Sequence, residues 1–165
     1  DLGIYDSTLL IITGDHGEEF QESGFWGHTS NFTPEQIEVP MFLLGNGIAP
    51  GVERRPTSHV DFAPTVLEAL GADPAQRTEW CQGENLFTPL EDRERVVAGW
   101  AHLGLLTDDG IFRVRMGGRS LSDIDVFDAA WLPREGALQL ILGRAGALEE
   151  LSTECQRFLL TGSQE

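Results

Sequence analysis

The sequence predicts an α/β fold with a parallel sheet and flanking helices, followed by a small antiparallel sheet and a terminal helix. The runs Thr8–Thr13 and Val39–Leu44 are apolar on both faces. This is typical of strands in a parallel sheet, whose two faces are both covered by helices. Asp108-Asp109-Gly110 stands between two apolar runs, which is typical of a β-hairpin. Residues 135–160 carry apolar side chains at helical spacing, which predicts the terminal helix.

The first predicted part, residues 1–76, is the α/β core. Residues 18–34 have no clean period and are rich in Gly, Ser, Asn and aromatic side chains, so we expect an ordered functional loop there. A short amphipathic helix is predicted after Asp61, an N-cap candidate, and Gly71 is its natural stop.

The second predicted part, residues 77–165, is a small α+β subdomain. We expect a strand near 95–100, a hairpin made of 103–107 and 111–116, a short strand over 124–127 and the terminal helix. Gly143 and Gly146 weaken the helical pattern and predict a break in that helix.

The composition excludes several classes of function. The chain of 165 residues has 27 acidic and 11 basic side chains, a net charge of −16, and none of the basic residues is Lys. Such a surface repels phosphate backbones, so nucleic acid is not an expected partner. The absence of Lys excludes a lysine nucleophile or Schiff base.

Two further features concern compartment and membrane. No apolar run approaches the roughly 20 residues that span a bilayer. Cys81 and Cys155 lie far apart and form no CxxC pair, so a zinc ribbon or thioredoxin-type site is excluded. Both a disulfide between them and two free thiols are compatible with the sequence.

The stretch Gly14-Asp15-His16-Gly17 directly follows the first predicted strand. Open α/β sheets carry their chemistry just outside the carboxyl ends of their strands. Asp15 and His16 are adjacent, so they can offer a carboxylate oxygen and an imidazole nitrogen to one cation. The alternative is a plain turn, in which Asp15 accepts backbone hydrogen bonds and His16 is partly exposed.

Four ordered pieces of the first 72 residues resemble the C-terminal half of the sulfatase domain, in the alkaline phosphatase-like superfamily. Their order and spacing, more than any one piece, carry the resemblance. The pieces are Tyr5–Glu18, Gly24-Phe25-Trp26-Gly27-His28, Val39-Pro40-Met41 and His59–Gly71. The resemblance implies the C-terminal part of an alkaline phosphatase-like sandwich, and the later hairpins and helix fit its small subdomain in architecture alone.

The resemblance also implies a chemistry, the metal-assisted cleavage or transfer of a sulfate or phosphate ester. Asp15 and His16 match the family's Asp-His metal ligands, for a divalent ion such as Ca²⁺, Zn²⁺ or Mn²⁺. His28 matches the region where the family places a Lys or His that contacts the ester or protonates the leaving oxygen. A histidine can do either, because its ordinary pKa is about 6.5.

Other candidates surround these three residues. Trp26 is expected to line the wall of the site. His59 lies at a helix start and is a substrate-binding candidate, although a structural role is the alternative. Glu18 and Glu19 are expected to be solvated loop residues.

The segment Glu22–His28 suggests a branch of the family. Classical sulfatases usually have a Lys near the position of His28, whereas phosphoethanolamine and phosphoglycerol transferases more often show a Gly-rich or aromatic lead-in to a lone His. The segment resembles the latter, which favours phosphoryl-type transfer and leaves hydrolysis open.

The nucleophile expected from the resemblance, a Thr, Ser or formylglycine-type Cys, has no counterpart in this chain. We therefore expect a fragment of a longer, membrane-anchored, periplasmic parent that acts on a sulfated or phosphorylated small molecule or lipid head group. With two of about four metal ligands, the fragment itself is expected to be inactive and metal-free. Uncovered core strands predict self-association.

A second class of function stays open: a sulfatase-like membrane regulator or binding protein that has lost the chemistry. Retention of Asp15, His16 and His28 favours the enzyme. The nucleophile and an acidic metal ligand in preceding sequence would discriminate between the two.

Overall fold

The computed structural model describes residues 3–29, 31–89, 93–118 and 120–159, with side chains up to residue 153. The chain divides into two compact units. The first joins Asp1–Pro50 to Val96–Glu165, and the second is Gly51–Arg95. The boundary predicted at residue 76 lies inside the second unit.

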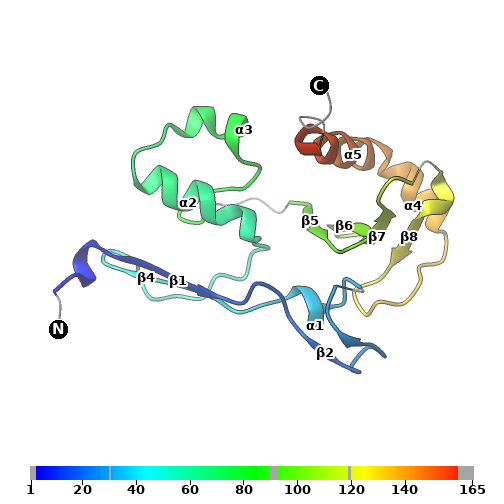
Figure 1. The fold of residues 1–165 in the computed structure, drawn as a ribbon, viewed down its shortest axis with the longest axis horizontal. Coiled ribbons are helices and arrows are strands. Elements are labelled where there is room, and N and C mark those ends of the chain that lie inside the picture. Colours follow the sequence, from blue (N-terminus) through cyan, green and yellow to red (C-terminus); the bar gives the residue numbers. More distant parts are fainter. Residues whose placement is uncertain (1–2, 30, 90–92, 119, 160–165) are drawn as a thin grey trace, which may run out of the picture. The chain divides into compact units, whose positions relative to one another are not determined.

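The first predicted strand is β1 (Leu9–Thr13), and its partner is β4 (Met41–Gly45). The two strands form an antiparallel ladder that runs from Leu9 opposite Gly45 to Thr13 opposite Met41 (Figure 1). The prediction of a parallel pairing is therefore wrong for these strands. The reason is the connection, which doubles back through a hairpin and one short helix instead of crossing over to the same edge.

One face of this ladder is apolar and exposed. The exposed fractions of its four large side chains lie between 43% and 57%; they are Leu10, Ile12, Phe42 and Leu44. Leu10 lies opposite Leu44, and Ile12 lies opposite Phe42. The expectation that both faces are covered is not met within the described residues, because a ladder of two strands covers little of its own surface.

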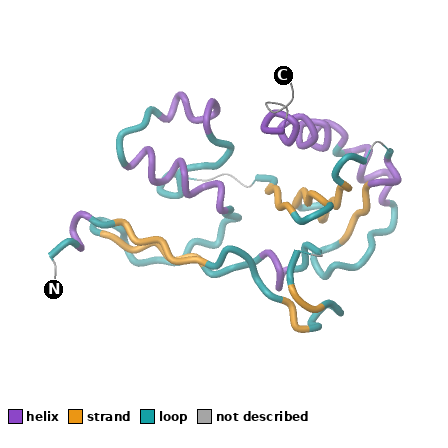
Figure 2. Tube along the Cα trace, in the orientation of Figure 1, coloured by secondary structure: helices purple, strands orange, loops and turns teal. Residues whose placement is uncertain are grey.

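The later part of the first unit contains a four-stranded sheet in the order β5 (Arg95–Ala98), β6 (His102–Thr107), β7 (Gly110–Arg115) and β8 (Ile124–Phe127). This confirms the predicted strands and the hairpin at Asp109-Gly110. The terminal helix is broken as expected, into α4 (Ala137–Gly143) and α5 (Ala145–Leu159), as Figure 2 shows.

The core of the first unit forms where these helices pack on the sheet. One cluster of buried side chains consists of Leu105, Phe112, Val126, Ile141 and Leu151. A second cluster, Phe32, Ile111 and Trp131, joins the segment between β1 and β4 to the same sheet. Phe32 is buried at 3% exposure. This contact fixes the loop that carries the candidate site just before α1.

The second unit contains η2 (His59–Asp61), α2 (Phe62–Ala69), η3 (Pro74–Gln76) and α3 (Arg77–Trp80). The predicted helix and its stop are confirmed, since α2 begins directly after Asp61 and Gly71 has a positive φ of 98°. Asp61 does not cap α2 with its side chain, however. Its buried carboxylate accepts hydrogen bonds from the backbone N–H groups of Ser58 and Glu84 and pairs with Arg93.

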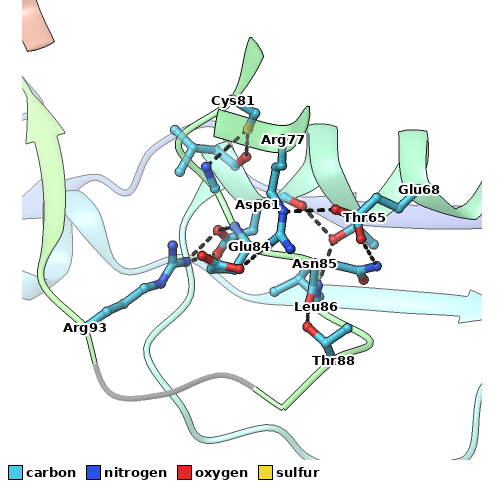
Figure 3. A network of polar contacts seen from close by, with 12 residues as sticks. Asp61, Thr65, Glu68, Arg77, Cys81, Glu84, Asn85, Leu86, Thr88 and Arg93 are labelled. Carbon is cyan, nitrogen blue, oxygen red and sulfur yellow. Dashed lines mark hydrogen bonds and ion pairs between the residues drawn. The ribbon is translucent and has the colours of Figure 1, made fainter. Parts of the chain in front are cut away.

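Figure 3 shows how this network holds the segment that follows α3. Asn85 donates to Glu68 at 2.8 Å, and the backbone N–H of Leu86 donates to Thr65 at 2.9 Å. The Cys81 thiol donates to the Val60 carbonyl at 3.3 Å. The side chain of Cys155 lies outside the described residues, so a disulfide and two free thiols both stay compatible with the sequence.

Within the parts of the chain that the structure describes, no helix combines the length and apolarity that a membrane crossing requires.

Candidate active-site loop

The candidate site lies on the loop between β1 and β4, residues 14–40. Within it, β2 (Glu19–Phe20) and β3 (Trp26–Gly27) form a small antiparallel hairpin, and α1 (Pro34–Ile37) follows. The expected irregular loop is therefore ordered, with two short strands and one helical turn that no periodic pattern in the sequence predicts.

Glu19 anchors this loop, because its side chain is fully buried at 0% exposure. One carboxylate oxygen accepts from the backbone N–H groups of Ser23 and Phe25 at 3.0 and 2.9 Å. The other accepts from the Thr33 hydroxyl at 2.8 Å and the Gln36 amide at 2.9 Å. The expectation that Glu19 is a solvated loop residue is therefore wrong.

The charge of Glu19 is maintained by these donors. Burial alone would raise the pKa of the carboxyl, but the hydrogen bonds from Gln36, Thr33 and the backbone outweigh it and hold the pKa of Glu19 below its ordinary value. One carboxylate thus ties together the hairpin turn and the start of α1.

Gly17 brings the start of the loop against α1. Its backbone N–H donates to the Gln36 carbonyl at 2.9 Å. A Cβ at this position would lie 2.0 Å from the Glu35 carbonyl oxygen, so only glycine permits the approach. The chain direction just after Asp15-His16 is fixed by this contact.

Asp15 and His16 lie where β1 ends, as predicted. Asp15 Oδ2 lies 3.7 Å from His16 Nε2, and the Asp15 side chain is 91% exposed. A hydrogen bond from its own backbone N–H and then the nearby imidazole of His16 lower the pKa of Asp15. The carboxyl is therefore ionised over a wider pH range than usual.

The ring of His16 is oriented by the chain itself. Its Nδ1 lies 2.8 Å from the Gly17 carbonyl oxygen. A carbonyl oxygen only accepts, so Nδ1 donates this hydrogen bond and Nε2 is the ring nitrogen that lies beside Asp15. Metal-binding histidines are typically held in this way by a backbone carbonyl.

His28 stands across the loop from His16. Its ring stacks on the His16 ring with 3.9 Å between centroids and 27° between planes. Its Nδ1 lies 2.7 Å from Glu18 Oε2. The structure therefore brings Asp15, His16 and His28 together. Glu18 is exposed, as expected, and also contacts His28.

The β2–β3 register explains why Glu18 meets His28. Glu19 lies opposite Gly27 and Phe20 opposite Trp26, so Glu18 and His28 are the next facing positions. Positive φ angles flank His28, 91° at Gly27 and 70° at Thr29. A positive φ is rare for a β-branched residue such as Thr29, and backbone strain of this kind is often found at functional sites.

The remaining two candidates are Trp26 and His59. Trp26 is 66% exposed and packs edge-on against Phe20 at 6.0 Å. His59 lies in η2 of the second unit, exposed, with its ring edge-on to Phe62. The site roles of both residues stay predictions.

The donor set suits a divalent metal ion. Two ligand atoms that each lie about 2.1 Å from one ion are separated by roughly 3 to 4 Å, which the 3.7 Å between Asp15 Oδ2 and His16 Nε2 satisfies. His16 Nε2 and the Asp15 carboxylate lie side by side just after β1. Both residues therefore fit the ligand role that the sequence assigned to them.

Together these observations define a mixed α/β protein in which a carboxylate and two imidazoles lie close together on the loop after a sheet strand. Residues 1–72 match the protein family described as Sulfatase. This part of the chain belongs to the sulfatase family.

Curated relatives agree with this assignment. The chain is 34% identical over 90 residues to the choline-sulfatase of Rhizobium meliloti, which covers 54% of this chain and 17% of that protein. It is 40% identical over 100 residues to the low-salt glycan biosynthesis sulfotransferase Agl7 of Haloferax volcanii, covering 56% and 24%. It is 28% identical over 95 residues to the multifunctional alkaline phosphatase superfamily protein PehA of Trinickia caryophylli, covering 56% and 18%. The chain thus spans a quarter or less of the length of these relatives.

Proposed function

We propose that this chain is one part of a longer sulfatase-type enzyme and supplies half of its active site. The single observation that carries the proposal is the convergence of Asp15, His16 and His28 on one loop, with the Asp15 carboxylate 3.7 Å from His16 and the His28 ring 3.9 Å from the His16 ring. The reaction is the cleavage or transfer of a sulfate or phosphate ester.

Asp15 and His16 would hold a divalent cation, which when bound neutralises ester oxygens and favours an ionised nucleophile. His28 acts on the other side of the ester. It donates a hydrogen bond to an ester oxygen, or a proton to the leaving oxygen, from the ring nitrogen that does not face Glu18. Glu18 keeps the His28 ring in this orientation, and the exposed Trp26 offers an apolar wall for the alcohol part of the ester.

Two details extend the proposal. The aromatic, Gly-containing lead-in to His28 favours phosphoryl-type transfer to or from an envelope component, in the periplasm of a membrane-anchored parent. The chain alone lacks a nucleophile of the family type, so we expect no turnover from it. A regulator that has lost the chemistry is the second hypothesis, and turnover separates the two.

The proposal is tested by turnover of an aryl sulfate and an aryl phosphodiester by the full-length protein. We expect Asp15→Asn and His28→Ala each to lower kcat/KM by about 100-fold or more. Glu38→Gln, an exposed acidic residue after α1, is the matched control and should leave kcat/KM unchanged. Turnover of neither ester would favour the regulator, and unchanged kcat/KM in both site variants would overturn the proposal.

We also propose that the isolated chain self-associates through the apolar face of β1 and β4. Leu10, Ile12, Phe42 and Leu44 are the exposed side chains of that face. Sedimentation velocity should show a concentration-dependent increase in mass, and the double variant Ile12→Lys and Phe42→Lys should reduce it. A wild-type chain that stays monomeric at high concentration would contradict this expectation.

A further inference from the structure

Three side chains that surround the same small space were not grouped by the sequence. His16, Glu18 and His28 each offer one ligand atom, and these atoms all lie within 4.8 Å of one another. The group is distinct from the pair formed by Asp15 and His16. Its carboxylate is that of Glu18, directly before β2, and its second imidazole is that of His28, directly after β3.

The spacing is close to that of a filled metal site. Ligand atoms about 2.1 Å from a tetrahedral ion lie roughly 3.4 Å apart, so the three side chains need to close by about 1.4 Å at most. The His16 and His28 rings are stacked, so both must also turn until a nitrogen of each points at the ion. The side chains of His16, His28 and Glu18 are 41%, 42% and 40% exposed, so they are not enclosed by the core.

The backbone beneath the group is held in place. Glu18 directly precedes Glu19, whose buried carboxylate accepts four hydrogen bonds. Gly17, between His16 and Glu18, is pinned to α1. The ladder of β2 and β3 places His28 opposite Glu18. The three ligands therefore start close together, which reduces the entropic cost of binding an ion.

The chemistry of the group selects the kind of ion. Two imidazoles and one carboxylate form the N₂O set of open zinc sites, in which water takes the fourth position. Ca²⁺ and Mg²⁺ prefer six or more oxygen ligands and are poorly served by two histidines. The net charge of −16 further raises the local concentration of cations.

We propose that His16, Glu18 and His28 form a three-ligand site for Zn²⁺ or a cation of similar character, which the chain fills without the rest of a sulfatase domain. From the sequence we expected two metal ligands and a metal-free chain. The structure instead brings three donor side chains, His16, Glu18 and His28, close together. The site shares His16 with the Asp15 pair, so the two arrangements compete for that imidazole.

The test is a calorimetric titration of the whole chain with ZnCl₂ and, separately, CaCl₂. We expect one Zn²⁺ per chain and no comparable Ca²⁺ binding. Glu18→Gln and His28→Gln should each weaken Zn²⁺ binding by about tenfold or more. The control Glu38→Gln should stay within about threefold of wild type. Circular dichroism checks that each variant is folded, which the exposure of Glu18 and His28 favours.

The possible outcomes separate this proposal from the proposed function. Zn²⁺ affinity that is lost in Asp15→Asn but kept in Glu18→Gln and His28→Gln would assign the ion to the Asp15–His16 pair and overturn the three-ligand site. Absence of Zn²⁺ binding to the chain would also overturn the three-ligand site. It would not contradict the proposed function, which concerns the full-length enzyme. Imidazole ¹⁵N spectra give a second readout: Zn²⁺ should shift the nitrogens of His16 and His28 and leave those of His59 and His102 in place.

Discussion

Replacing Glu19 by Ala is expected to destabilise the first unit by on the order of 4 kcal/mol or more. The substitution leaves four donors without their acceptor, namely the backbone N–H groups of Ser23 and Phe25 and the side chains of Thr33 and Gln36. Thr33 and Gln36 are buried, and each buried donor that loses its partner costs about 1 to 3 kcal/mol; the part-buried N–H groups of Ser23 and Phe25 add a smaller loss. Urea unfolding measures the loss, and hydrogen exchange of residues 14–36 locates it.

The exposed Glu38 provides the control for this variant, and Glu38→Ala should change the free energy of unfolding by no more than about 0.5 kcal/mol. A Glu19→Ala protein as stable as wild type, with unchanged exchange in the loop, would contradict the anchoring role.

The charge of Glu19 adds a pH dependence. Because the pKa of Glu19 is lowered in the folded protein, its stabilising contribution is complete above the unfolded value of about 4.5 and is lost as the pH falls through the folded pKa. The difference in unfolding free energy between wild type and Glu19→Gln should therefore be largest near neutral pH and shrink below pH ~4.5.

Replacing Asp61 by Ala is expected to destabilise the second unit by about 3 to 5 kcal/mol. Asp61 is fully buried, and its loss leaves the Arg93 guanidinium, at 21% side-chain exposure, without its partner. The backbone N–H groups of Ser58 and Glu84 lose their acceptor at the same time (Figure 3).

Limited proteolysis of residues 51–95 and urea unfolding measure this effect. Glu79→Ala, at an exposed position of α3, is the matched control and should behave as wild type. If Asp61→Ala and Glu79→Ala are cleaved at the same rate, the carboxylate does not hold this unit together.

The parts of the fold that the sequence predicted are those specified by local chemistry. The hairpin depends on the two turn residues Asp108 and Asp109 and on Gly110, which follows them with a positive φ. The helix α2 depends on a start after Asp61 and a stop at Gly71. The direction of β4 relative to β1 has no such local determinant, because an apolar run looks the same in a parallel and an antiparallel pair.

The sequence named the side chains that lie close together on the loop, but not the residues that support them. Asp15, His16 and His28 could be named from the sequence, whereas Glu19 could not be placed, since its partners Thr33 and Gln36 lie 14 and 17 residues away. The contact between Glu18 and His28 depends on two strands of two residues each, too short to show alternation.

The central claim is that Asp15 and His16 are metal ligands of a sulfatase-type active site. The most direct measurement is the divalent metal content of the full-length protein, purified without chelators, by inductively coupled plasma mass spectrometry. The account predicts bound metal in the wild type and its loss in the double variant Asp15→Asn and His16→Gln. Equal metal content in the two proteins, with both folded, would contradict it.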